Sequence, residues 1–164
     1  VIEHIRENHP YETMAYDMYP LLSFENRSAA EGPGLGRVGE LDEKRELTSF
    51  ALDIKERLGL KSVRVVGKQD LTVDKAAVCA GGGSSLMNDF FSSGAQVFIS
   101  GDLRYHDARA VEAANLGLID IGHFASEHLI MEAIAERLNK ILSEDGFDVK
   151  VEACGLENDP FMIL

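Results

Sequence analysis

The chain has 164 residues, of which 45% are hydrophobic, and its 16 basic residues against 28 acidic ones give a formal net charge of −12 at pH 7. That length fits one domain, or one domain with a small appendage, and the apolar fraction suffices for a buried core, which excludes global disorder. The acidic balance argues against binding to nucleic acid or to an anionic membrane surface, and no run approaches the roughly 18 apolar residues of a membrane-spanning helix, so we expect a cytoplasmic protein.

The first forty residues differ in pattern from the rest. Apolar residues at positions 1, 2 and 5 are typical of the last turns of a helix, and residues 14–19 alternate as a strand does. A helix entered midway suggests a piece of a longer protein. We therefore expect residues 1–40 to form part of a small α+β unit, with a short strand at residues 38–41.

From residue 41 onward, short apolar runs alternate with segments of helical periodicity. Strands are predicted at residues 63–66, 76–80, 96–100, 118–121 and 147–151. Because strands joined by helices usually run parallel, this pattern predicts an α/β fold. We expect a layered, mostly parallel sheet with flanking helices. The two cysteines, Cys79 and Cys154, fall in apolar segments and are expected to be buried thiols.

Three loops follow predicted strands and should meet at the carboxyl edge of the sheet, where open α/β sheets bind ligands. The first, residues 81–85, has the sequence GGGSS. Backbone N–H groups at Gly83 and Ser84 could cradle an anion at the start of a helix. The alternative is a tight strand-to-helix turn in which Ser84 is a cap.

The second and third loops each place a carboxylate and a histidine four positions apart. Asp102 and His106 could bind a metal, orient a ligand or exchange protons, or they could cap a turn and the next helix. His123 and Glu127 would share one face of a first helical turn, a spacing that suits Zn²⁺, Mn²⁺ or Fe²⁺, although helix capping would also explain them. Two ligands alone fall short of a stable metal site.

Five stretches of the chain resemble, in the same order, motifs of the Nif-three-like proteins, a family often labelled GTP cyclohydrolase I type 2. They are HPYETMAYDMYPL at residues 9–21, GLGRVG at 34–39, GDLRYHD at 101–107, GHFASE at 122–127 and NDPF at 158–161. The resemblance covers nearly the whole chain, so the family's architecture becomes an expectation for this one.

The resemblance implies a dinuclear site for Zn, Mn or Fe between two related α/β halves. His123 and Glu127 would be the metal ligands of the C-terminal half, residues 41–164. The other ligands would come from an N-terminal half that is absent here. Residues 1–40 would be the latter part of an inserted, ferredoxin-like α+β domain, and the intact protein would form a hexamer.

From the resemblance we expect a metal-dependent hydrolase of a nucleotide-like or phosphorylated small molecule. His106 and Asp102 are its candidate catalytic residues, and Gly83 and Ser84 its candidate anion cradle. The alternative is a non-enzymatic metal-binding regulatory or scaffold protein, or a metal chaperone. The expected partners are a small-molecule substrate, the N-terminal half and further copies of the chain.

Overall fold

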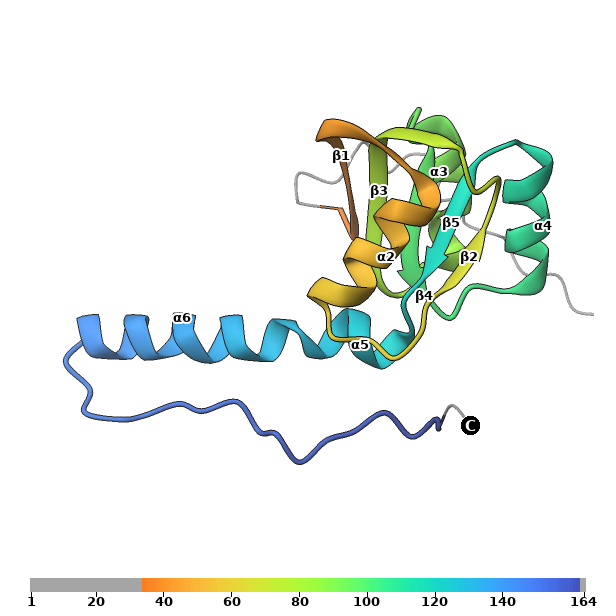
Figure 1. Ribbon diagram of the computed structural model, residues 1–164. Coiled ribbons are helices and arrows are strands. Elements are labelled where there is room, and N and C mark those ends of the chain that lie inside the picture. Colours follow the sequence, from red (N-terminus) through yellow and green to blue (C-terminus); the bar gives the residue numbers. More distant parts are fainter. Residues whose placement is uncertain (1–33, 163–164) are drawn as a thin grey trace, which may run out of the picture. The chain divides into compact units, whose positions relative to one another are not determined.

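The computed structural model describes residues 34–162, which form a five-stranded sheet flanked by helices (Figure 1). In spatial order the strands are β1 (Gly36–Glu46), β3 (Thr72–Gly82), β4 (Val97–Gly101), β5 (Gly117–Asp120) and β2 (Arg64–Val66). The three central strands β3, β4 and β5 are parallel, whereas the edge strands β1 and β2 run antiparallel to their neighbours. The predicted α/β fold is therefore confirmed as a mixed sheet with a parallel centre.

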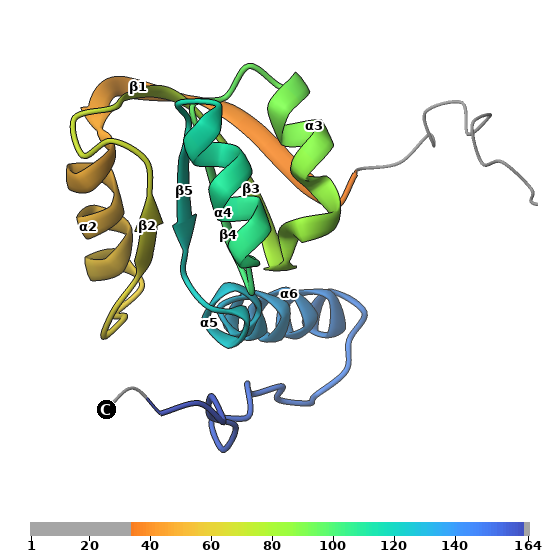
Figure 2. The ribbon, with the colours of Figure 1, turned by 90° about the vertical axis from the view of Figure 1, so that its right-hand side faces the viewer.

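Helices flank this sheet, on both of its faces and beyond its carboxyl edge (Figures 1 and 2). They are α2 (Leu47–Arg57), the short 3₁₀ helix η2 (Gly83–Leu86), α3 (Met87–Ser92), α4 (Tyr105–Ala113), α5 (His123–His128) and α6 (Ile130–Glu144). Figure 2 shows α2 on one side of the sheet and α3 with α4 on the other, with α5 and α6 beyond its carboxyl edge. The sheet is thus the middle layer of three.

The central strand β4 is buried at every position. Its side chains alternate between two apolar clusters: Val97 and Ile99 pack with α2, whereas Phe98 packs with α3 and α4. On the latter side, the rings of Phe98 and Phe90 stack with centroids 5.3 Å apart. A strand covered on both faces must be apolar throughout, which is why residues 96–100 were predictable as a strand.

The structure corrects two details of the predicted elements. Residues 147–151 are not a strand: the backbone N–H and C=O of Val151 bond the side-chain amide of Asn139 in α6, at 2.7 and 2.6 Å. Those backbone groups therefore have partners outside any sheet. In addition, Cys154 is exposed, whereas Cys79 is buried as predicted.

The predicted α+β unit at residues 1–40 lies largely outside the described residues. Within them, residues 36–40 pair with β3 as the beginning of β1, so the expected domain boundary at residue 40 falls inside a strand. No helix in residues 34–162 is long and apolar enough to cross a membrane.

Candidate functional site

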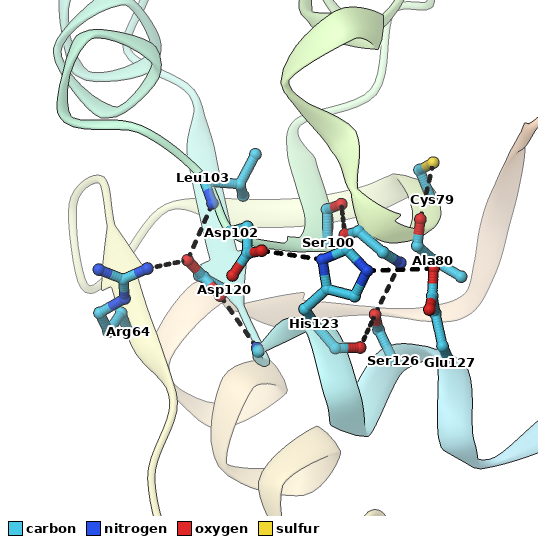
Figure 3. A network of polar contacts seen from close by, with 12 residues as sticks. Arg64, Cys79, Ala80, Ser100, Asp102, Leu103, Asp120, His123, Ser126 and Glu127 are labelled. Atoms are coloured by element: carbon cyan, nitrogen blue, oxygen red, sulfur yellow. Dashed lines mark hydrogen bonds and ion pairs between the residues drawn. The ribbon is translucent and has the colours of Figure 1, made fainter. Parts of the chain in front are cut away.

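The loops that follow β3, β4 and β5 come together at the carboxyl edge of the parallel strands (Figure 3). Gly101 allows two of these loops to approach each other closely. A Cβ atom on Gly101 would lie 2.7 Å from both the carbonyl carbon of Gly122 and the backbone nitrogen of His123. The absence of a side chain at Gly101 therefore lets the loop after β4 contact the loop after β5.

His123 begins α5 and lies between two carboxylates. Its Nδ1 is 2.8 Å from Oδ2 of Asp102, and its Nε2 is 3.3 Å from Oε1 of Glu127, one helical turn on. Hydrogen bonding to Asp102, followed by the charge of Glu127, raises the pKa of His123 above its ordinary value. The side chain of His123 is 47% exposed, so a ligand can reach the ring.

Asp102 reaches His123 through an unusual backbone conformation. Its φ of +50° lies in the left-handed region that residues other than glycine seldom adopt. Such conformations persist where the surroundings enforce them, and they are frequent at functional sites. The 2.8 Å contact with His123 is made from this position.

Gly81, near the end of β3, lies against Glu127 and Nε2 of His123. A Cβ atom at this position would lie 2.3 Å from Oε1 of Glu127 and 3.4 Å from Nε2 of His123, and its φ is +66°. Two serines fix its backbone: its N–H donates to Ser126 Oγ at 2.7 Å, and its carbonyl accepts from Ser100 Oγ at 3.1 Å. Only glycine satisfies both the φ angle and the close approach.

Ser84 and Gly83 are engaged within the fold. The hydroxyl of Ser84 donates to Oδ2 of Asp107 at 2.5 Å, and a Cβ on Gly83 would lie 2.3 Å from Ser100 Oγ. Burial favours a higher pKa for Asp107, but the hydrogen bonds from Ser84 and Arg104 outweigh it and hold the pKa below its ordinary value. This geometry favours a tight turn over the anion cradle, but Ser84 is not its cap: Gly82 is the N-cap residue of η2, and no side chain caps this helix.

His106 takes no part in the polar contacts around His123. It is exposed in the first turn of α4, where its ring meets that of Tyr105 edge-on at 5.9 Å. Across residues 34–162, no hydrogen bond or ion pair joins His106 or Ser84 to His123. The structure therefore brings together Asp102, His123 and Glu127 from the predicted set.

The sequence interpretation placed Gly81 in the candidate anion-binding loop but not beside His123, and it missed Ser126 and a buried carboxylate, Asp120. Asp120 ends the apolar run of β5 and is 4% exposed. A charged residue at the end of a buried strand was the available signal, because such a group must be paired inside the fold.

The donor set can act as half of a metal site. A carboxylate can only accept a hydrogen bond, and Asp102 at 2.8 Å from Nδ1 is nearer than Glu127 at 3.3 Å from Nε2. The shorter contact favours a neutral ring with its proton on Nδ1, which leaves the lone pair of Nε2 beside Glu127. Carboxylates fix metal-binding histidines in this way. Within residues 34–162, no group of three or more His, Cys, Asp or Glu side chains could hold an ion unaided.

Comparisons with known proteins agree over almost the whole chain. A family model described as Duf34/NIF3 (NGG1p interacting factor 3) matches residues 4–160. A protein of Bacillus subtilis named GTP cyclohydrolase 1 type 2 homolog is 35% identical over 164 residues, and a Staphylococcus aureus protein of the same name is 32% identical over 160 residues. The match takes in 100% and 98% of this chain, respectively, and 42% of each relative.

Solved structures show the same fold. A Bacillus cereus protein described as related to NIF3 has a TM-score of 0.76 and 33% sequence identity, over 99% of this chain and 43% of that one. A Staphylococcus aureus hypothetical protein has a TM-score of 0.75 and 32% identity, over 80% and 43%. The chain thus spans less than half the length of the proteins that it resembles.

Proposed function

The chain belongs to the Duf34/NIF3 family, and on this premise we propose that it is part of a metal-binding protein in which His123 and Glu127 hold a divalent cation. One observation carries this proposal: Nε2 of His123 lies 3.3 Å from Glu127 Oε1, while Asp102 occupies Nδ1. A nitrogen and a carboxylate oxygen side by side suit Zn²⁺, Mn²⁺ or Fe²⁺.

We further propose that the remaining ligands lie outside this chain. Two protein ligands are fewer than the three or four of a stable site. The matched relatives are more than twice as long as the matched stretch, which leaves room for a second α/β half to complete a dinuclear centre. Assembly into a hexamer, as the family resemblance implies, belongs to the same proposal.

The proposed activity is hydrolysis of a nucleotide-like or phosphorylated small molecule, in line with the cyclohydrolase name that the relatives carry. A bound divalent ion would supply Lewis-acid chemistry and a water of lowered pKa. In this chain, His123 and Glu127 would bind, Asp102 would orient the imidazole, and Gly81 would keep the approach to Nε2 open. Asp102 is thus a positioning residue in this proposal.

A specific observation favours the alternative, a metal-binding regulatory protein, scaffold or metal chaperone. His106 was a candidate catalytic residue that could exchange protons, yet it is exposed on α4 and makes no hydrogen bond or ion pair with His123 among the described residues. A hydrolase needs a proton acceptor within reach of the attacking water. If no such group comes from another part of the protein, a binding role remains.

Metal analysis and turnover of the whole protein test these proposals together. The protein would be prepared with Zn²⁺, Mn²⁺ or Fe²⁺, its metal content measured, and nucleotides and phosphorylated small molecules supplied as substrates. We expect His123→Ala to lose metal and activity together, and His106→Ala to keep the metal. Metal retained in full by both His123→Ala and Glu127→Gln would refute the site, and metal without turnover would favour the binding role.

A further inference from the structure

Asp120 connects the two loops that carry the site. Its Oδ1 accepts a hydrogen bond from the N–H of Gly122 at 2.9 Å, and its Oδ2 accepts one from the N–H of Leu103 at 3.2 Å. The guanidinium of Arg64, on the edge strand β2, also donates to Oδ2. Figure 3 shows this carboxylate between Arg64 and the two loops.

The two backbone donors flank the residues that hold the imidazole. Leu103 directly follows Asp102, and Gly122 directly precedes His123. Both loops have left-handed backbone at this point, with φ of +50° at Asp102 and +85° at Gly122. Glycine adopts a positive φ without strain, whereas the conformation of Asp102 needs support from its surroundings. The carboxylate of Asp120 provides a hydrogen bond next to each of these two positions.

The carboxylate of Asp120 is buried and accepts hydrogen bonds from these three donors. The side chain is 4% exposed, whereas its partner Arg64 is 74% exposed and reaches it from the solvent side. All three donors to Asp120 require acceptors, and an ionised carboxylate offers only acceptors. An asparagine at the same place would turn an NH₂ group toward at least one of these donors, which would leave that buried contact unsatisfied.

We propose that Asp120, supported by Arg64, is the positioning residue that sets Asp102 against Nδ1 of His123 and so directs Nε2 toward Glu127. The inference rests on the proposed function where it gives Nε2 a role in binding a metal. The arrangement of Asp102, His123 and Glu127 that it explains exists without any ligand. It predicts that the tautomer of His123 depends on Asp120, although the two side chains share no hydrogen bond.

The test is NMR of the metal-free chain, with long-range ¹H–¹⁵N correlations of the His123 ring at alkaline pH, where the ring is neutral. We expect the wild-type ring to carry its proton on Nδ1. In Asp120→Asn the Nδ1–H form should fall from the major to the minor species, with a matching shift of the Nε2 resonance. The matched control is Asp53→Asn, which removes a carboxylate of α2 that is paired with Arg45 of β1 and with Arg57 of α2. It should lower stability without changing the tautomer.

Two results would overturn the proposal. One is a folded Asp120→Asn chain whose His123 tautomer equals that of the wild type; the other is an equal change in Asp53→Asn. If Asp120→Asn fails to fold, Arg64→Met decides, because that exposed side chain can be replaced without opening the core, and an unchanged tautomer there also refutes the proposal. Adding Zn²⁺ to the whole protein, in which the remaining ligands are present, separates the two ideas: a tautomer shift in the metal-free chain without any metal-induced change at His123 of the whole protein would refute the metal site alone.

Discussion

Gly81 shows how a single missing side chain shapes the site. Gly81→Ala would introduce a Cβ atom 2.3 Å from Glu127 Oε1 on a backbone of φ +66°. Gly59→Ala is the matched control, since Gly59 has a φ of +62° and nothing within 4 Å of its Cβ position. We expect the control to lose about 1–2 kcal/mol of unfolding free energy from backbone strain alone.

Gly81→Ala should lose more than this control, and it should also displace the carboxylate of Glu127 from Nε2 of His123. Urea unfolding measures the first effect and ¹H–¹⁵N spectra of the His123 ring measure the second. Equal stability losses in the two variants, with unchanged His123 resonances, would show that Gly81 is only a turn residue.

The hydrogen bond from Ser84 to Asp107 should give a stability that depends on pH. Because the folded pKa of Asp107 is lowered, its contribution is present above the unfolded value of about 4 and is lost as pH falls through the folded pKa. We expect Ser84→Ala to cost about 1–2 kcal/mol near neutral pH, and less as Asp107 protonates.

Ser92→Ala is the control for this pH effect. Ser92 donates to the uncharged carbonyl of Asn88 at 2.8 Å, so its substitution should cost the same at every pH. Chemical unfolding of both variants between neutral and acidic pH makes the comparison. A cost for Ser84→Ala that stays constant or grows on acidification would contradict the role given to Asp107.

The spacing of His123 and Glu127 was enough to predict that they share one face of a helix, because a helical turn places residues four apart side by side. The pairing of Asp102 with His123 was beyond such reasoning. It joins residues 21 positions apart, and it depends on a φ of +50° that an aspartate seldom adopts. Local patterns predict periodic contacts, whereas this contact results from the meeting of two loops.

Among the elements, β4 is the central strand of the sheet and is buried at every position. Phe98 is 2% exposed and stacks on Phe90, so Phe98→Ala should lower the unfolding free energy by about 3–5 kcal/mol. Val38 in the edge strand β1 is 49% exposed, and Val38→Ala should cost well under about 1 kcal/mol. Urea unfolding of both variants provides the measurement. Similar losses in the two would contradict the assignment of β4 to the centre of the sheet.

The elements that the sequence predicted best are those buried on both faces. The apolar runs of β4 and β5 are buried at every position, and they were recognisable because a strand covered on both faces needs apolar side chains on both. Residues 147–151 had the right alternation but pair with no strand within residues 34–162, because alternation alone does not supply a neighbouring strand. Local periodicity does not encode which strand β2 pairs with. It therefore could not predict that β2 runs antiparallel to β5.

On the scale of the whole molecule, α6 leaves an apolar stripe exposed. Ile134, Leu138 and Ile141 are 42–44% exposed, and Ala135 is the buried residue of this helix. Apolar surface of this kind favours association. We expect the chain to self-associate in light scattering as its concentration rises, and the double variant Ile134→Glu, Leu138→Glu to associate less.

Lys140→Glu is the control for that experiment, because it makes the same change in net charge on α6 and leaves the stripe intact. It should associate as the wild type does. Equal weakening in the control would assign the effect to charge repulsion, and a wild type that stays monomeric at every concentration would contradict the prediction.

Isothermal titration of Zn²⁺ into this chain tests the central claim most directly. It measures whether His123 and Glu127 are the ligands that this chain contributes to a metal site. With two ligands, binding should be weak, and it should vanish in His123→Ala and in Glu127→Gln while His106→Ala binds as the wild type does. Sub-micromolar binding that survives both His123→Ala and Glu127→Gln would contradict the account.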